Sequence, residues 1–161
     1  MKKEERTIAI AAFFITIIVV VLLPFFLPPQ RPAPIFVPTA MTLTGGTTTL
    51  VIDYAITQAE QQKGLSGTES LPDGRGLLFV FDKPAPPFWM PEMHYAIDII
   101  WIGEDKRIVD ITENATPESY PTQFRSTSPA KYVLEIGSGE ARKYSWAEGT
   151  PLIFDTPKAG K

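Results

Sequence analysis

The chain has 161 residues, which is enough for one domain with an appendage, and it contains no cysteine. The missing cysteines exclude disulfides, thiolate nucleophiles, thiolate zinc sites and iron–sulfur clusters. Between Met41 and Asp155 there are 9 basic and 16 acidic side chains, a net charge of −7, which argues against nucleic acid as a partner.

The first predicted element is a membrane anchor, because Thr7–Leu27 contains no charged residue. As a helix it measures about 31 Å, close to the roughly 30 Å hydrocarbon core of a bilayer. Lys2, Lys3 and Arg6 precede it and only Arg31 follows closely. We therefore expect a single-pass protein of the cell membrane, with residues 1–6 in the cytoplasm and the main domain outside. A cleaved signal peptide is the alternative, although the apolar run is longer than such peptides use and no small-residue cleavage pattern follows it.

A proline-rich stretch follows the anchor. Residues 28–40 contain five prolines, which favours polyproline II at ~3.1 Å per residue and a stalk of up to about 40 Å. Such stretches also serve as docking ligands for aromatic grooves, but the position beside an anchor favours a spacer. The folded domain is expected at 41–156, and residues 157–161 read as a tail.

The domain is predicted to be mainly β, a small α+β fold, and to open with a strand and a short helix. The β-branched run Thr47–Ile56 predicts the strand. Thr57 and Glu60 then form a capping-box pattern, and Gly64 is a natural residue to follow a helix. These signals predict a helix over Gln58–Lys63.

Two later strands are apolar on both faces. Gly76–Phe81 and Ala96–Ile102 are continuous apolar runs bounded by turn residues, which is typical of strands covered on both sides in a barrel-like or sandwich fold. A turn is expected at 103–107 and an irregular stretch at 113–130, and residues 137–149 predict a turn with a second short helix. Further strands are predicted at 107–112, Lys131–Ile136 and Thr150–Phe154.

Six blocks in order, KGLSG, GLLFVF, FWM, AIDIIWI, YVLEI and EGTPLIF, resemble the signature of the domain of unknown function 192 family over about Thr49–Phe154. The resemblance implies a β-rich domain that is often exported or membrane-anchored, and it implies no established activity. Ser66 and Gln61 depart from the family's methionine and arginine, and residues 91–93 depart from its Lys-Asn-Thr. The family's signature positions fall on Gly64, Leu65, Gly76, Leu78, Phe79, Trp89, Met90, Asp98 and Glu135.

The stretch FWMPEMHYAID holds the chain's only histidine and two of its four methionines. Met90, Met93 and His94 are donors that suit Cu(I), which makes a soft-metal protein one alternative. In an extended strand the two methionine side chains would point to opposite faces, and only an irregular loop would let them converge. Methionine is also a common core filler, so the segment also fits as the entry of a strand into the core.

Two acids, Asp98 and Glu135, interrupt apolar strands. Each is expected either to accept hydrogen bonds that fix the structure or to line a binding cleft. Together they would permit acid–base hydrolysis, the least favoured alternative.

Trp89, beside Pro86 and Pro87, is the best binding candidate, since aromatic and proline side chains form shallow pockets for peptides or sugars. The expected function is a membrane-anchored extracytoplasmic module that binds an unknown envelope ligand or protein. The predicted ligand-binding residues are Trp89, Met90, Asp98 and Glu135. No cofactor and no assembled catalytic site are expected, so catalysis stays open but is not favoured.

Overall fold

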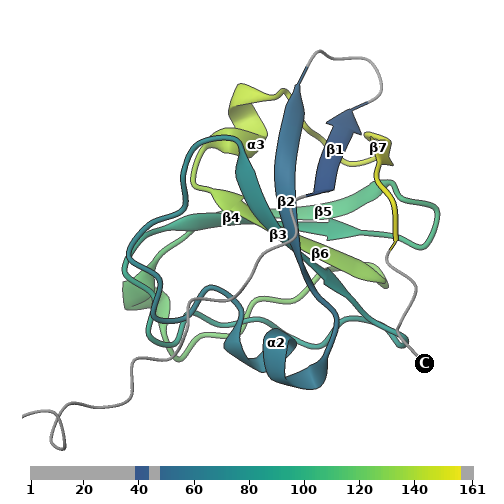
Figure 1. The fold of residues 1–161 in the computed structure, drawn as a ribbon. Coiled ribbons are helices and arrows are strands. Elements are labelled where there is room, and N and C mark those ends of the chain that lie inside the picture. Colours follow the sequence, from purple (N-terminus) through teal and green to yellow (C-terminus); the bar gives the residue numbers. More distant parts are fainter. Residues whose placement is uncertain (1–38, 44–47, 157–161) are drawn as a thin grey trace, which may run out of the picture. The chain divides into compact units, whose positions relative to one another are not determined.

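The computed structural model describes residues 39–43 and 48–156 (Figure 1). The predicted membrane helix Thr7–Leu27, most of the predicted stalk and the tail at 157–161 lie outside these residues. Within the part of the chain that the structure describes, no helix is long and apolar enough to cross a membrane. Thr39 and Ala40, the last two residues of the predicted stalk, belong to a strand.

The described residues form one mixed sheet of seven strands, with short helices in its connections. The strand order is β5-β4-β6-β3-β2-β1-β7, and only the β2–β3 pair is parallel. The predicted mainly β class with short helices is confirmed. In chain order the elements are β1 (Thr39–Leu43), β2 (Thr49–Ala55), α2 (Gln58–Lys63), β3 (Arg75–Val80), β4 (Ile97–Ile102), β5 (Ile108–Ala115), the 3-10 helix η1 (Pro117–Ser119), β6 (Tyr132–Gly137), α3 (Glu140–Lys143) and β7 (Leu152–Ile153).

The two ends of the strand order meet. Arg107, just before β5, forms an isolated antiparallel bridge with Pro151, just before β7. The backbone N–H of Ile108 donates to the carbonyl of Thr150 at 3.0 Å. Backbone groups that a flat sheet would leave unpaired at its edge are therefore paired here.

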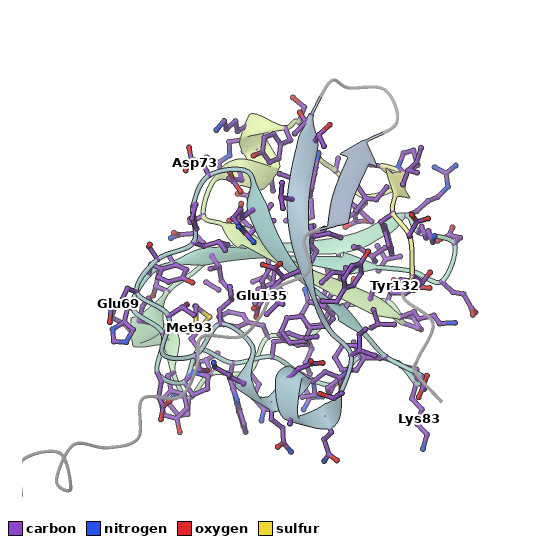
Figure 2. The ribbon with its side chains drawn as sticks, in the orientation of Figure 1. Glu69, Asp73, Lys83, Met93, Tyr132 and Glu135 are labelled. Atoms are coloured by element: carbon purple, nitrogen blue, oxygen red, sulfur yellow. The ribbon has the colours of Figure 1, made fainter. Side chains whose placement is uncertain are left out.

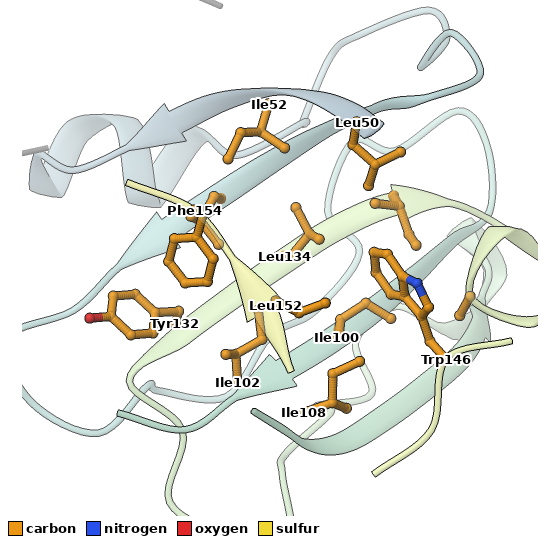
Figure 3. Packing of buried hydrophobic residues seen from close by; sticks show 13 residues of the cluster. Leu50, Ile52, Ile100, Ile102, Ile108, Tyr132, Leu134, Trp146, Leu152 and Phe154 are labelled. Carbon is orange, nitrogen blue, oxygen red and sulfur yellow. The ribbon is translucent and has the colours of Figure 1, made fainter. Parts of the chain in front are cut away.

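Each face of the sheet carries its own apolar cluster, because successive side chains of a strand point to opposite faces. β4 is buried along its whole length, as predicted for a strand covered on both sides. Figure 3 shows the first cluster, in which residues of β2, β4, β6 and β7 interdigitate. Its main members are Leu50, Ile52, Leu78, Ile100, Ile102, Ile108, Tyr132, Leu134, Ile136, Trp146, Leu152 and Phe154. The second cluster consists of Ala55, Leu65, Leu77, Phe79, Met90, Ile97, Ile99, Trp101, Ala115, Ala130 and Val133.

Helix α2 has the predicted bounds and the predicted caps. The hydroxyl of Thr57 accepts from the N–H of Glu60, and the Glu60 carboxylate accepts from the N–H of Thr57 at 2.8 Å. Gly64 ends the helix with a positive φ of 49°, a conformation that glycine adopts without steric cost. The connection from β2 to the parallel strand β3 therefore starts with a firmly bounded helix.

Other boundaries differ from the sequence prediction. β1 was not predicted, since its residues adjoin the proline-rich stretch. β5 continues to Ala115, three residues into the stretch expected to be irregular, and η1 follows within that stretch. β7 is confined to Leu152–Ile153, because the preceding residues Thr150 and Pro151 bond to the start of β5 instead.

Candidate functional site

A pocket of about 260 Å³ lies between α2, the loop that follows it and the segment from Pro86 to Met93. We call it the α2 pocket. Its lining mixes aromatic rings, prolines, glutamine amides and a single carboxyl group. The residues are Gln58, Gln61, Gln62, Lys63, Gly64, Leu65, Ser66, Phe79, Phe81, Pro86, Pro87, Phe88, Trp89, Pro91, Met93 and Glu135.

The apolar wall of the α2 pocket is a packed set of phenylalanine rings. Phe79 and Phe88 meet edge to face with ring centroids 4.9 Å apart, and Phe81 lies 6.2 Å from each of them. Phe88 also meets the buried Trp101 at 5.4 Å. This chain of ring contacts ties the wall to the second apolar cluster, so the wall is preformed and rigid. Trp89 stands at the rim with 52% of its surface exposed.

The polar floor of the pocket is Glu135, which can be located with Met93 in Figure 2. Glu135 lies in β6, opposite Leu77 of β3 and Ile99 of β4, and only 6% of its surface is exposed. Its Oε2 has no hydrogen-bond partner among the residues that the structure describes. Burial in this apolar setting raises the pKa of the Glu135 carboxyl from 4.5 to about 8, because the charged form loses its hydration.

Because Gly64 has no side chain, the pocket extends as far as the carboxyl group of Glu135. A Cβ at position 64 would lie 3.2 Å from the ring of Phe79 and 3.8 Å from Oε2 of Glu135. The carboxyl oxygen and the ring edge thus flank the point where a side chain is missing. Any larger residue would have to occupy this corner of the pocket.

The loop after α2 is fastened to the loop after Trp89. The hydroxyl of Ser66 donates to the carbonyl of Pro91 at 2.8 Å, and the N–H of Gly67 donates to the carbonyl of Glu92 at 2.8 Å. Nearby, the hydroxyls of Thr68 and Tyr95 are 2.6 Å apart. Burial raises the pKa of Tyr95, and the negative charge of Glu135 acts in the same direction.

Gln61 holds α2 against the sheet. Its Nε2 donates to the carbonyl of Val80 at 2.7 Å and to that of Ile56 at 3.1 Å, and it approaches the carbonyl of Ala55 at 3.4 Å. The amide therefore joins the helix to the ends of the parallel strands β2 and β3. This contact fixes the side of the pocket that α2 forms.

The model of the family of domains of unknown function 192 (DUF192), described as "Uncharacterized ACR", matches residues 40–154. The chain belongs to the DUF192 family. The resemblance read from the six sequence blocks is thereby confirmed. A comparison with curated proteins finds no match.

Two solved structures resemble the DUF192 domain. A protein of unknown function from Novosphingobium aromaticivorans DSM 12444 is 32% identical with a TM-score of 0.67, and the match covers 78% of this chain and 94% of that one. A candidate transcription regulator from Sinorhizobium meliloti 1021 is 26% identical with a TM-score of 0.69, and the match covers 73% of this chain and 94% of that one. The fold is therefore shared over almost the full length of both relatives.

The structure brings two of the four predicted binding residues together. Trp89 at the rim and Glu135 at the floor both line the α2 pocket. Met90, their companion in the DUF192 signature, is 2% exposed and belongs to the second apolar cluster. It therefore does not line the pocket, but it belongs to the same apolar cluster as Phe79 of the pocket wall.

Asp98 lies elsewhere and makes a set of structural hydrogen bonds. Its Oδ1 accepts from the N–H of Asn114 at 2.9 Å, and its Oδ2 accepts from those of Gly139 and Ala141 at 2.9 and 3.1 Å. Asp98 pairs with Ile136, the residue next to Glu135 on β6. Its side chain thus lies on the opposite face of the sheet from Glu135.

The residues of the soft-metal alternative are found in three different settings. Met90 is in the core, Met93 lines the α2 pocket and His94 is exposed at the surface. Among the described residues, no group of three or more His, Asp or Glu side chains is arranged to hold a metal ion. Met93 is therefore the one member of this set that is placed at the pocket.

Sequence reasoning did not recognise the aromatic wall or the role of Gly64. Phe79 and Phe81 were assigned to a buried strand and Gly64 to a helix end, and the family resemblance marked Gly64 and Phe79 as signature positions without giving either a role in a pocket. The available signal was the alternation in GLLFVF, which places both rings on one face. What the sequence did not contain was the pairing that sets this face beside Glu135.

Proposed function

We propose that this DUF192 protein is a membrane-anchored, extracytoplasmic module that binds a small ligand in the α2 pocket. The observation that carries the proposal is Oε2 of Glu135, a buried polar atom that has no partner within the described residues and lies at the floor of an aromatic pocket. Buried polar atoms in native proteins are nearly always paired, and exceptions of this kind often mark functional positions. A ligand donor supplies the missing partner.

The pocket dimensions favour a small occupant. Ligand pockets for drug-sized molecules usually measure about 300–1,000 Å³, whereas the α2 pocket measures about 260 Å³. Its wall is rigid and its rim carries the exposed ring of Trp89. We therefore propose a ligand that has a short apolar body and one hydrogen-bond donor, bound within a barrel-like scaffold whose closure is supported by the bonds beside β5 and β7.

The membrane arrangement rests on the sequence. The proposal that the domain lies outside the cytoplasm of a single-pass protein is supported by the uncharged run Thr7–Leu27, by the basic residues before it and by the proline-rich stretch after it. One structural relative is named as a candidate transcription regulator. The net charge of −7 over Met41–Asp155 opposes contact with nucleic acid, so we propose no such partner here.

The positions of the residues support neither the hydrolase nor the Cu(I)-binding alternative. A hydrolase that uses Asp98 with Glu135 would need both carboxyls on one side of the sheet, and they lie on opposite faces. A Cu(I) site would need Met90 to leave the core. Ligand binding is the function that the site supports best.

The test uses the full chain in nanodiscs and a panel of small uncharged, cationic and anionic fragments. Trp89 is 52% exposed, whereas Trp101 and Trp146 are 1% and 7% exposed, so acrylamide quenching reports mainly on Trp89. A fragment in the pocket is expected to protect Trp89 and to raise the melting temperature saturably. At a hundredfold excess over its dissociation constant it adds about 2.7 kcal/mol to the stability.

The control separates the pocket from other exposed rings. Trp89→Ala should weaken the stabilisation, whereas Tyr120→Ala, which removes an aromatic side chain that is 55% exposed and outside the pocket lining, should leave it unchanged. Equal stabilisation in both variants, or no saturable response to any fragment, contradicts the proposed function.

A further inference from the structure

We propose that the ligand of the α2 pocket carries a protonated primary amine, and that this ammonium group donates to Glu135 while a short alkyl body lies between the phenylalanine wall and Trp89. The proposal rests on the proposed function and names its substrate class. Its starting point is geometric: one carboxyl at the floor, aromatic rings at the wall and an open corner at Gly64.

The carboxyl group at the floor of the pocket can accept a hydrogen bond from a ligand. Glu135 is buried except for 6% of its surface, and its Oε2 is unpartnered within the described residues. An ionised carboxylate is purely an acceptor, and an ammonium group offers three N–H donors together with the opposite charge. A carboxylate or phosphate ligand could pair only with the protonated form of Glu135, and it would bring a further negative charge to a domain that already carries a net charge of −7 over Met41–Asp155.

The wall suits an organic cation. Aromatic rings attract ammonium groups through the negative potential of their faces, and Phe79, Phe88 and Trp89 all line the pocket. Pro86 and Pro87 add apolar surface that has no N–H donor to compete for the carboxyl. An alkyl body therefore fits the wall while its charged end reaches the floor.

The net negative charge of the domain also favours a cationic ligand. Met41–Asp155 carries 9 basic and 16 acidic residues, a net charge of −7, which attracts cations toward the domain. Among the residues lining the pocket in the described structure, Lys63 is the one cation, and it lies at the exposed end of α2. Glu135 is the one carboxyl of the same lining.

Binding should couple to proton release. Burial raises the pKa of Glu135 to about 8, so the free pocket holds a mostly neutral carboxyl at pH 7. In the described part of the chain, the titratable groups around this carboxyl include Tyr95, whose pKa is raised by burial, and Lys63 of the pocket lining. Asp53 lies two strands away on the same face of the sheet and forms an ion pair with Arg75 at 2.9 Å. An incoming ammonium favours the ionised carboxyl, so binding at pH 7 should release a proton from Glu135. Affinity should rise with pH up to about 8 and then level.

The experiment compares three probes of matched length by calorimetry on the full chain in phosphatidylcholine nanodiscs, with empty nanodiscs as the blank. Pentylamine has a charge and N–H donors, pentyltrimethylammonium has the charge alone, and pentan-1-ol has neither charge nor N–H. Pentylamine is expected to bind at least tenfold more tightly than either of the others at pH 7.5. Titrations in buffers with different ionisation heats give the number of protons released.

Two variants test the assigned atom. Glu135→Gln keeps the shape of the side chain and one accepting oxygen. It is expected to reduce pentylamine affinity at least tenfold and to abolish proton release, but to retain pentan-1-ol binding, because the amide oxygen can still accept from the hydroxyl group. Glu148→Gln makes the same charge change at an exposed site outside the pocket lining and should alter none of these values. Retained pentan-1-ol binding also shows that the pocket of the Glu135→Gln variant is folded.

The outcomes separate the two proposals. Equal affinity for pentylamine and pentan-1-ol, both weakened by Trp89→Ala, overturns the ammonium assignment and leaves the pocket as a binding site. Tight pentylamine binding that is unchanged in Glu135→Gln also overturns the assignment. Absence of pentylamine binding overturns it too, and the fragment panel then decides separately whether the pocket binds anything.

Discussion

At the scale of single residues, Asp98 and Glu135, two of the four buried acids in the described part of this DUF192 domain, have opposite roles. Asp98 is fully buried, and both of its carboxylate oxygens accept from backbone N–H groups, which belong to β5 and to the start of α3. Glu135 is almost as buried, yet Oε2 is left without a partner in the described structure. Asp98 therefore stabilises the fold, whereas the burial of Glu135 lowers the stability and gives the pocket its carboxyl group.

Glu135 should therefore make stability depend on pH. Its folded pKa of about 8 lies above the unfolded value of 4.5, so the folded state holds a proton that the unfolded state has lost between these values. The free energy of unfolding should fall by roughly 1.4 kcal/mol per pH unit from pH 5 to pH 8 relative to Glu135→Gln. Urea denaturation of both proteins at pH 5, 6, 7 and 8 measures this difference. Parallel pH profiles would contradict the assignment of a protonated, buried carboxyl.

Asp98 should be essential to stability and irrelevant to the pocket. Asp98→Ala leaves the N–H groups of Asn114, Gly139 and Ala141 without their acceptor, which should cost at least about 3 kcal/mol. Asp82→Ala, at an exposed position, should stay within about 0.5 kcal/mol of the parent protein. Chemical denaturation of both variants measures their free energies of unfolding. A decrease of less than about 1 kcal/mol in Asp98→Ala would show that the hydrogen bonds of Asp98 are dispensable.

At the scale of helices and strands, the elements that depend on residues close in sequence were predicted correctly, and those that depend on distant pairing were not. The bounds of α2 were predicted correctly because Thr57, Glu60 and Gly64 are neighbours in sequence and act on the helix itself. β1 was missed because its strand state depends on pairing with β2 and with the distant β7. For the same reason β7 proved shorter than its apolar pattern indicated.

Gln61 should be the residue that holds α2 in place. Gln61→Ala removes the donor to the carbonyls of Val80 and Ile56, which should lower the free energy of unfolding by about 1–2 kcal/mol and weaken probe binding in the pocket. Gln62→Ala changes the same residue type one position later, where the side chain is exposed, and should cost less than about 0.5 kcal/mol. Thermal and urea unfolding of both variants provide the measurement. Equal effects would remove the special role of Gln61.

At the scale of the whole molecule, the class of the domain was predictable, whereas the sequence left a barrel-like and a sandwich fold open and did not predict which strands pair. Continuous apolar strands indicated a sheet covered on both faces, which the two apolar clusters bear out. The parallel β2–β3 pair and the insertion of β6 between β3 and β4 depend on contacts between distant residues. Trp89 and Glu135 were therefore identified singly, and the sequence did not reveal that they share one pocket.

The full chain is predicted to be an integral membrane protein with its domain outside the cytoplasm. After expression in bacteria, the full chain should remain in the membrane fraction through a carbonate wash, because Thr7–Leu27 is long enough to span a bilayer. Protease added outside spheroplasts should digest the domain and spare a cytoplasmic fusion partner placed before Met1. A chain lacking residues 1–38 should be recovered in the soluble fraction. Protection of the domain from external protease would contradict the proposed orientation.

The placement of β1 has a mechanical consequence. Any tension on residues before Thr39 enters the domain through this strand. β1 does not sit at the end of the strand order, since it is hydrogen-bonded to β2 on one side and to β7 on the other. A pull from the N-terminal side is thus shared between two antiparallel ladders, one of them formed by the last strand of the described chain. β1 is therefore held along both of its edges, so a force applied to it has to break two sets of backbone hydrogen bonds.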